Sequence, residues 1–274
     1  MENIQGKRAL VTGASSGLGA DFARQLAAQK ANLVLVARRR ERLEELASEL
    51  RSKHEVEVTV VAMDLEDSDA PEELYDLLKA RKLPVDILVN NAGFGVYGNF
   101  VDTDWEREQA MLQLDIISLV HLTKLFSRDM VQRGWGRILQ VSSIGAYQPC
   151  PTYACYGAAK SFVLNFGEAI NYELRGTGVS CSVLSPGYTA TEFLKRTGQE
   201  QTIYQKMMVM ESGDVARRGL EAMFRGTPSL VPGIVNKLVV FSLRLVSRPM
   251  ATAIAHLTMR NEDPTPRTRV VTGG

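Results

Sequence analysis

Short runs of aliphatic and β-branched residues alternate along this chain with longer segments of helical periodicity, and this alternation restricts the fold more than any other feature. Strands are expected at residues 9–13, 33–38, 56–63, 85–93, 137–143 and 179–187, with one more near 228–233. Helical patterns fill residues 17–30, 38–52, 71–82, 104–132 and 152–176. Nearly all-apolar strands separated by helices are typical of parallel βαβ units with helices on both faces of the sheet. The predicted fold class is α/β, with a doubly wound parallel sheet.

The expected organisation is a single domain over residues 1–274, because no linker rich in proline, glycine or serine divides the chain. A Rossmann-like dinucleotide-binding core is expected at about residues 5–190. The strand–helix alternation weakens after Pro186, so residues 191–274 are expected to form a substrate lid and a C-terminal helical extension. A net charge of +1 gives no indication of a nucleic-acid partner.

Cysteine and histidine placement argues against several classes of site. The three cysteines stand at spacings that match no zinc or disulfide pattern, and the three histidines are scattered. We therefore expect no metal site, and we expect the thiols to be reduced. The scattered histidines also give little support for a serine hydrolase. The start of the chain lacks the apolar run of a signal peptide, and no run reaches the ~18 apolar residues of a membrane span. A cytoplasmic location is expected.

The segment TGASSGLG joins the first expected strand to the first helix. Glycines at such a turn let the backbone approach a pyrophosphate, and the helix N-terminus points unpaired N–H groups at it. The spacing G-x-x-x-G-x-G departs from the usual dinucleotide fingerprint, and a tight strand–helix connection is the alternative. Its position after the first strand favours a cofactor turn, with the binding residues Gly13, Ser15, Ser16, Gly17, Leu18 and Gly19.

The end of the second strand indicates which nicotinamide cofactor is bound. NAD-binding folds place an acid here, whereas an arginine accommodates the 2′-phosphate of NADP. The strand ends with Ala37 in the acid position and continues with Arg38, Arg39 and Arg40. We predict NADP(H) over NAD(H), with Arg38 as the phosphate partner and Arg39 and Arg40 as a solvated helix start. Asp64, with Leu65 beside it, is expected at the adenine, or alternatively as a cap of the following helix.

The segment TYACYGAAK contains two tyrosines and one lysine. A phenol has an unperturbed pKa of about 10, and a neighbouring ammonium lowers it towards the working range of a proton donor. Tyr156 and Lys160 stand at i and i+4, on one helix face. Tyr153 lies two helical turns, or about 10 Å, from Lys160 and is too far for direct coupling. Tyr156 is the predicted acid, and Tyr153 is expected at the helix entry, bordering a substrate pocket.

Several motifs occur in order: TGASSGLG, NNAG at residues 90–93, Ser143, Tyr156 with Lys160, and PGYTAT at residues 186–191. Their order and spacing over residues 5–230 resemble the single-domain branch of the short-chain dehydrogenase/reductase family. The resemblance implies hydride transfer between a nicotinamide and a carbonyl or secondary alcohol, with Tyr156 as general acid/base. It also implies that Lys160 holds the nicotinamide ribose and that Ser143 hydrogen-bonds the substrate oxygen. Ser142 should point to the opposite face of its strand.

Further cofactor contacts follow from the same resemblance. Asn90 is expected to brace the sheet, while the residues after it leave room for the cofactor. The segment after the sixth strand is expected to grip the carboxamide and pyrophosphate, although an ordinary loop and helix cap is the alternative. The residues implied are Asn91, Ala92, Gly93, Pro186, Gly187, Thr189 and Thr191, besides Tyr156 and Lys160 themselves.

Asp115 departs from the family pattern, since many members carry asparagine at this position of the helix after NNAG. That asparagine is thought to hold a water that links the lysine to solvent. One interpretation is that Asp115 replaces it as an acceptor paired with Lys160 through water, and this is the one we favour. The other is an impaired relay, with slow catalysis or a chain that mainly senses NADPH.

The substrate is less well determined by the sequence. The expected lid at residues 192–212 contains Phe193, Leu194, Tyr204, Met207, Met208 and Met210, which suit an apolar ligand or the core. We expect a bulky apolar ketone, such as a 3-oxoacyl thioester or a lipid-like carbonyl. The expected oligomer is a homodimer or homotetramer formed through the helices at 104–132 and 152–176.

The spacing of basic residues in the C-terminal segment allows two interpretations. Lys237, Arg244 and Arg248 fall at i, i+7 and i+11 of an apolar segment. One interpretation is a helix over residues 235–250 in weak contact with a membrane surface, peripheral to it. The other, commoner for such a helix, is packing against its own domain or a neighbouring subunit.

Overall fold

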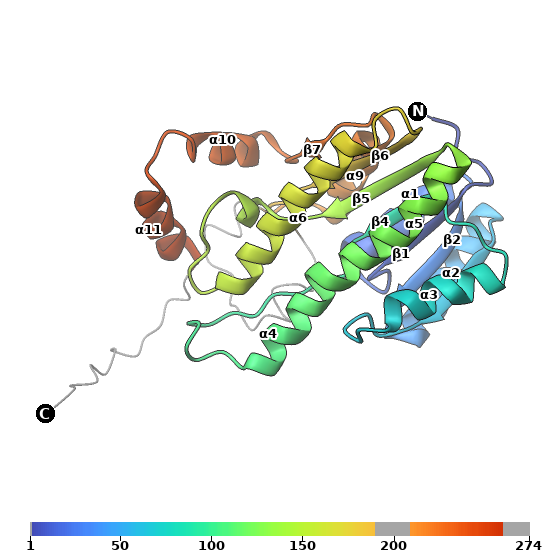
Figure 1. Cartoon of the computed structure of the whole chain (residues 1–274), viewed down its shortest axis with the longest axis horizontal. Coiled ribbons are helices and arrows are strands. Elements are labelled where there is room, and N and C mark those ends of the chain that lie inside the picture. The colour runs from blue at the N-terminus through green and yellow to red at the C-terminus, as the bar shows by residue number, and fades with distance from the viewer. Residues whose placement is uncertain (1, 190–208, 260–274) are drawn as a thin grey trace, which may run out of the picture.

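The computed structural model describes residues 2–189 and 209–259. Its centre is a seven-stranded parallel sheet with the order β3-β2-β1-β4-β5-β6-β7 (Figure 1). The strands are β1 (Arg8–Thr12), β2 (Asn32–Ala37), β3 (Val58–Ala62), β4 (Ile87–Asn90), β5 (Gly136–Val141), β6 (Val179–Leu184) and β7 (Ser229–Leu230). The order reverses between β1 and β4, and all seven expected strands are present. The predicted doubly wound α/β sheet is confirmed.

Helices cover both faces of the sheet. One face carries α1 (Gly17–Ala28), α2 (Arg40–His54) and α9 (Ser212–Phe224). The other carries α3 (Ala70–Ala80), α5 (Leu119–Arg133) and α6 (Ala154–Glu173). Two short elements, α4 (Trp105–Leu112) and the 3-10 turn η2 (Ile144–Tyr147), lie next to the carboxyl ends of the strands.

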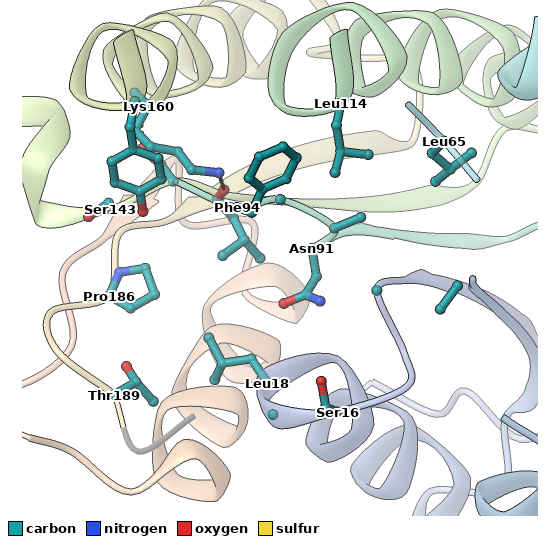
Figure 2. Close-up of a pocket in the computed structure, with 18 of the residues that line it drawn as sticks. Ser16, Leu18, Leu65, Asn91, Phe94, Leu114, Ser143, Lys160, Pro186 and Thr189 are labelled. Carbon is teal, nitrogen blue, oxygen red and sulfur yellow. Dashed lines mark hydrogen bonds between the residues drawn. The ribbon is translucent and has the colours of Figure 1, made fainter. Parts of the chain in front are cut away.

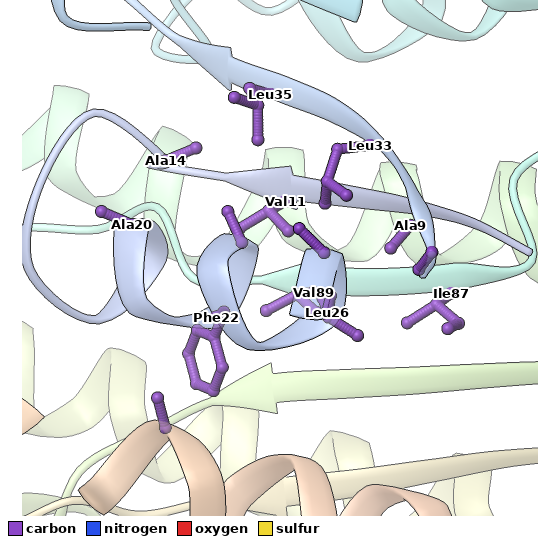
Figure 3. Close-up of a cluster of buried hydrophobic side chains, with 14 of the residues drawn as sticks. Ala9, Val11, Ala14, Ala20, Phe22, Leu26, Leu33, Leu35, Ile87 and Val89 are labelled. Atoms are coloured by element: carbon purple, nitrogen blue, oxygen red, sulfur yellow. The ribbon is translucent and has the colours of Figure 1, made fainter. Parts of the chain in front are cut away.

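The core forms because the central strands β1, β2 and β4 carry buried apolar side chains on both faces of the sheet. On the α1 face, Phe22 and Leu26 belong to one buried cluster with the strand residues Val11, Leu35 and Val89 (Figure 3). These side chains are fully buried, and burying a large apolar side chain stabilises the fold by about 1.5–3 kcal/mol. The paired strands therefore hold their carboxyl ends, where the candidate site lies, in fixed register.

The structure refines two expected elements near the site. Strand β4 ends at Asn90, so Asn91, Ala92 and Gly93 leave the sheet. The long helix expected at 104–132 runs from α4 to α5, but residues Gln113–Ser118 form a π-helical turn, η1. Such a turn is frequent at functional sites, and this one contains Asp115.

The helix Trp105–Arg133 is the one element among the described residues that is long and apolar enough to cross a membrane. It comprises α4, η1 and α5, and it packs against the sheet and α3. Buried side chains of Asp115 and Ser118 attach it to the domain interior. A core helix passes the same test of length and composition, so the finding is weak evidence for a membrane span.

The C-terminal extension differs from the expected helix. Residues 235–250 do not form one helix, because α10 ends at Ser242 and α11 begins at Arg248. Lys237 lies on α10, Arg244 in the connection and Arg248 at the start of α11. The predicted basic stripe at i, i+7 and i+11 is therefore wrong, since it requires an unbroken helix.

Candidate active site

A cavity of ≈ 530 Å³ opens at the carboxyl ends of the strands, beside the reversal between β1 and β4. Ligands of open α/β sheets bind at this position. Figure 2 shows Ser16 and Leu18 of the glycine turn on one side of it, and Ser143 and Lys160 on the other. Pro186 and Thr189 lie along its left edge in this view. The cavity lining includes predicted residues from the glycine turn, the segments after the second and third strands, the NNAG turn, the segment from Ser143 to Lys160 and the segment that begins at Pro186; Gly19 and Asp115 are not part of the lining.

The glycine turn fits a dinucleotide. Gly13 and Gly17 have φ values of +67° and +53°, which glycine adopts without strain. A Cβ on Gly19 would lie 2.3 Å from the Gly13 carbonyl oxygen, so no side chain fits where the helix meets the turn. Ser15, Ser16, Gly17 and Leu18 line the cavity at the N-terminus of α1. Backbone and helix end therefore form a cradle suited to phosphate groups.

Thr12 joins the glycine turn to the NNAG turn, a role the sequence analysis missed. Its hydroxyl oxygen accepts from the amides of Asn91 at 3.0 Å and Ala92 at 2.9 Å. The Asn91 side-chain amide donates back to the Thr12 carbonyl at 2.9 Å. A threonine at the end of a strand carries no sequence signal of such a contact, because its partner lies some eighty residues away.

Asn90 lies inside the sheet, as expected for a bracing residue. Its side-chain amide donates to Thr123 Oγ1 at 2.9 Å and to Gln140 Oε1 at 3.0 Å. These bonds link β4 to α5 and β5. All three side chains are buried, and buried polar groups are stable when they are hydrogen-bonded to one another in this way.

The side chains of Arg38 and Arg39 lie at the end of the cavity next to the glycine turn. Arg38 Nη1 lies 2.7 Å from Glu66 Oε1 and 3.5 Å from Asp64 Oδ2. Burial raises the pKa of the Glu66 carboxyl, and the Arg38 charge opposes that shift. Asp64 does not cap the next helix, whose N-cap is Asp69, so that alternative for Asp64 is wrong.

Arg39, which the sequence analysis assigned to solvent, reaches into this cavity. Its Nη2 donates to Ser15 Oγ at 3.0 Å and to Ser16 Oγ at 2.9 Å. Arg39 thus joins the end of β2 to the glycine turn, and the expectation that it is merely solvated is wrong. The run of three arginines after the strand was the one sequence signal for this contact. The sequence does not give the direction of the Arg39 side chain, because that direction depends on packing.

The opposite end of the cavity holds Ser143, Tyr156 and Lys160. The ammonium of Lys160 lies 5.6 Å from the centre of the Tyr156 ring, on the same face of α6. Burial, and secondarily the Asp115 charge, raises the pKa of the Tyr156 phenol, while a hydrogen bond from Ser143 lowers it. Ser143 also accepts from the Gly145 amide at 3.1 Å, which fixes its side chain at the start of η2.

Asp115 contacts Lys160 directly. The Lys160 Nζ–Asp115 Oδ2 distance is 2.8 Å, and the two side chains are 6% and 0% exposed. The pairing through water that we favoured from the sequence is therefore wrong. Burial raises the pKa of the Asp115 carboxyl, and the Lys160 charge opposes that shift. The π-helical turn η1 carries Asp115 into reach of α6.

Gly93 makes room for this ion pair. A Cβ at Gly93 would lie 2.7 Å from Asp115 Oδ1 and 3.1 Å from Lys160 Nζ. The amide of the next residue, Phe94, donates to Asp115 Oδ1 at 3.2 Å. In Figure 2 the Phe94 ring lies between the Lys160 side chain and Leu114, above the cavity. The glycine of NNAG therefore serves the ion pair as well as the cavity.

Two residues next to the predicted centre lie as expected. Ser142 points away from the cavity centre, and its hydroxyl donates to the Lys160 carbonyl at 2.7 Å. Tyr153 is the N-cap residue of α6 and borders the cavity, with its ring centre 5.7 Å from that of Tyr156. Thr189 lines the cavity, whereas Thr191 lies outside the described residues.

The wall beyond Tyr156 is mostly apolar. Ile144, Cys150, Tyr153 and Tyr188 line it, and Met259 at the end of α11 joins them. Burial raises the pKa of the Cys150 thiol to about 11, so this cysteine is a neutral, inert part of the wall at neutral pH. Among the expected lid residues only Met210 is described; Phe193, Leu194, Tyr204, Met207 and Met208 lie outside the described residues.

Comparison with known proteins gives a consistent set of relatives. Sulfoacetaldehyde reductase 2 of Chromohalobacter salexigens is 35% identical over 76% of this chain and 84% of its own length. The 17-beta-hydroxysteroid dehydrogenase type 3 of Mus musculus is 30% identical over 93% of this chain and 85% of its own. The human very-long-chain 3-oxoacyl-CoA reductase is 34% identical over 69% of this chain, but the match spans only 62% of that longer protein.

Solved structures agree with the fold. A 7beta-hydroxysteroid dehydrogenase matches with a TM-score of 0.84 and 26% identity, covering 92% of this chain and 97% of that one. A short-chain dehydrogenase from Sphingobium yanoikuyae, in complex with NADPH, matches with a TM-score of 0.79 and 29% identity, covering 96% and 99%. A family model described as short chain dehydrogenase matches residues 7–202. This chain belongs to the short-chain dehydrogenase/reductase family of nicotinamide-dependent oxidoreductases.

Proposed function

We propose that this chain is an NADPH-dependent reductase of bulky apolar ketones, with Tyr156 as the proton donor. The observation that carries the proposal is the convergence of Ser143, Tyr156 and Lys160 on one end of a cavity whose other end is a phosphate-binding turn. Proton donor and cofactor cradle thus open into the same space. The reverse reaction, oxidation of a secondary alcohol, uses the same groups.

The cofactor would supply hydride to the carbonyl carbon. Ser143 donates a hydrogen bond to the carbonyl oxygen and so orients the substrate. Tyr156 then gives its phenolic proton to that oxygen as negative charge develops on it. Lys160 lies close enough to stabilise the phenolate that remains, and its ammonium also faces the space expected for the nicotinamide ribose.

The Asp115–Lys160 pair favours the reducing direction in this proposal. A carboxylate beside Lys160 neutralises part of the charge that would otherwise lower the Tyr156 pKa. A phenol with a raised pKa stays protonated at neutral pH, which is the form that a reductase needs. Oxidation needs the phenolate and should therefore require more alkaline solution.

A preference for NADPH over NADH is supported by two arginines. Ala37 leaves the usual acid position empty, while Arg39 and Arg38 stand at the same end of the cavity. Arg39 contacts the glycine turn directly and is the stronger candidate for the 2′-phosphate. Arg38 is partly neutralised by Glu66 and Asp64, so we assign it the secondary contact.

An apolar substrate is supported by the wall formed by Ile144, Cys150, Tyr153, Tyr188 and Met259. Two of the relatives named above act, by their names, on steroids or very-long-chain acyl groups. Sulfoacetaldehyde, the substrate named for another relative, is small and charged. The side chains of Ile144, Cys150 and Met259 in this wall are apolar and fit the first group better.

The test is a panel of carbonyl compounds assayed by NADPH absorbance and repeated with NADH. We expect turnover with steroid or 3-oxoacyl ketones, faster with NADPH, and little with sulfoacetaldehyde. Tight NADPH binding without turnover across the panel would instead support an NADPH sensor. A cytoplasmic, oligomeric enzyme with α5 and α6 at the interface is part of the proposal, and light scattering tests its oligomeric state.

A further inference from the structure

Helix α10 (Ile234–Ser242) exposes its apolar side. Ile234, Leu238 and Phe241 are 76%, 62% and 56% exposed, and they stand at i, i+4 and i+7, on one helix face. The single buried side chain of this helix is Asn236, a polar residue. A surface helix ordinarily buries its apolar stripe and exposes its polar one, and α10 does the reverse.

Helix α11 (Arg248–Met259) repeats this arrangement. Met250, Ile254 and Leu257 are 55%, 47% and 62% exposed and again stand at i, i+4 and i+7. Its buried residues are only Ala251 and Ala255. Figure 1 shows both helices at one end of the molecule, beyond η2 and the start of α6. We name the exposed faces of α10 and α11 the C-terminal apolar face.

The helices are nevertheless attached to the active site. Asn236 packs on the cofactor loop, since a Cβ at Gly187 would lie 2.5 Å from its Nδ2. Its Nδ2 donates to the Pro232 carbonyl at 2.9 Å, which fixes α10 against the end of β7. Met259, at the last turn of α11, lines the cavity beside Tyr188. The C-terminal apolar face therefore adjoins the substrate end of the cavity.

The charged side chains of α10, α11 and the connection between them are all positive. Lys237, Arg244 and Arg248 are exposed, and no Asp or Glu occurs between Glu221 and Glu262. Exposed apolar residues interspersed with cations complement an anionic phospholipid surface, which offers acyl chains and negative headgroups together. A second copy docked symmetrically through α10 and α11 would bring two sets of three cations together, with no carboxylate on these helices to pair with them. Charge complementarity therefore favours lipid over self-association.

We propose that the C-terminal apolar face docks on an anionic phospholipid membrane and places the cavity next to the bilayer, so that a lipid-like ketone enters from it. The docking is independent of the proposed reductase activity, whereas the delivery of substrate rests on it. An apolar substrate of low solubility is concentrated in a bilayer, and entry from there avoids transfer through water.

The first experiment measures co-sedimentation of the full chain with vesicles of phosphatidylglycerol and phosphatidylcholine, against vesicles of phosphatidylcholine alone. We expect binding to the anionic vesicles that weakens as salt rises, because the cations contribute through screened attraction. No binding to anionic vesicles at low salt would overturn the proposal.

Two variants assign the binding to this face. Leu238→Asp together with Leu257→Asp should lower the partition coefficient by at least about tenfold, since two anchors are lost and charge is introduced. Val101→Asp is the matched control: Val101 is 88% exposed in the loop before α4, outside α5, α6 and the cavity lining, and this variant should bind vesicles as the wild type does. Both variants change exposed side chains, and NADPH binding verifies that each is folded. Equal loss in both, or in neither, would contradict the assignment.

Light scattering identifies the competing occupant. If Leu238→Asp with Leu257→Asp converts an oligomer to a smaller species and leaves vesicle binding unchanged, the face is an interface between copies and membrane docking is wrong.

A final measurement separates docking from catalysis. Turnover of a steroid ketone supplied in anionic vesicles should fall about tenfold in the double variant, while turnover of a soluble ketone stays unchanged. Vesicle binding without any turnover would retain the docking and refute the reductase.

Discussion

The two ends of the cavity each hold an ion cluster, and the clusters differ in their contact with water. At the end next to the glycine turn, the Arg38 side chain is 55% exposed. It faces Glu66 and Asp64, whose side chains are 23% and 48% exposed. At the end next to Tyr156, the side chains of Lys160 and Asp115 are 6% and 0% exposed. Coulomb attraction in water is weak and screened, whereas in the interior it is strong and the charges have lost their hydration.

The difference in exposure indicates that the two ion clusters have different roles. The exposed cluster can exchange partners at little cost, so Arg38 can turn from a carboxylate to a phosphate when a cofactor binds. The buried pair cannot separate without leaving an uncompensated charge, so it holds Lys160 in one place. One end selects a ligand, and the other fixes the electrostatics of the reaction.

The largest expected effect on activity comes from a substitution of Tyr156, which lies next to the buried ion pair. Tyr156→Phe removes the proton donor, and we expect ketone reduction to fall by about 10³-fold. NADPH binding, followed by fluorescence, should persist because the cavity is unchanged. Tyr153→Phe is the matched control one turn away and should retain most of the activity. Reversal of the two results would refute the assignment of Tyr156.

The next effect tests the ion pair itself. Lys160→Met leaves the buried Asp115 carboxylate without a countercharge, and we expect the free energy of unfolding to fall by about 3–5 kcal/mol. Adding Asp115→Leu should recover much of that loss without restoring activity. Denaturant unfolding measures both variants. If the single variant were as stable as the wild type, the pair would not be the buried, rigid element described above.

At the exposed end, the strongest effect is expected at Arg39. Arg39→Ala should raise the KM for NADPH by about ten- to thirtyfold, since a charge-assisted contact of about 1.5–2 kcal/mol is lost, with little change for NADH. Arg40→Ala is the control, because Arg40 is exposed and forms an ion pair with Glu44 on the same helix. Equal effects on both cofactors would show that Arg39 supports the turn rather than the phosphate.

Arg39 also shows where prediction from the sequence ends. The strands, the glycine turn and the family motifs were predictable because they depend on local periodicity and spacing. The direction of Arg39 and the anchoring by Thr12 depend on partners far along the chain. The sequence located Asp115 but not its direct contact with Lys160, because the π-helical turn that brings the carboxylate there has no recognised sequence signal.

A smaller effect returns to the buried end and concerns pH. The Asp115 charge adds to burial in raising the Tyr156 pKa, so Asp115→Asn should lower that pKa. Alcohol oxidation needs the phenolate and rises with pH, so its rising limb should move to lower pH. Reduction needs the phenol, so its decline at high pH should also begin earlier. pH profiles in both directions measure this, and unchanged limbs would exclude electrostatic coupling of Asp115 to Tyr156.

The smallest effect completes the comparison at Glu66. Glu66→Gln removes the nearest carboxylate from Arg38, and we expect NADPH affinity to rise a few-fold and stability to change by less than about 0.5 kcal/mol. Glu57→Gln, which removes the partner of Arg8 outside the cavity lining, is the control and should leave NADPH affinity unchanged. Isothermal titration distinguishes two roles for Glu66. A rise means that Glu66 competes with the phosphate for Arg38; a fall means that it holds the guanidinium in place, and the exposed cluster is then as fixed as the buried pair.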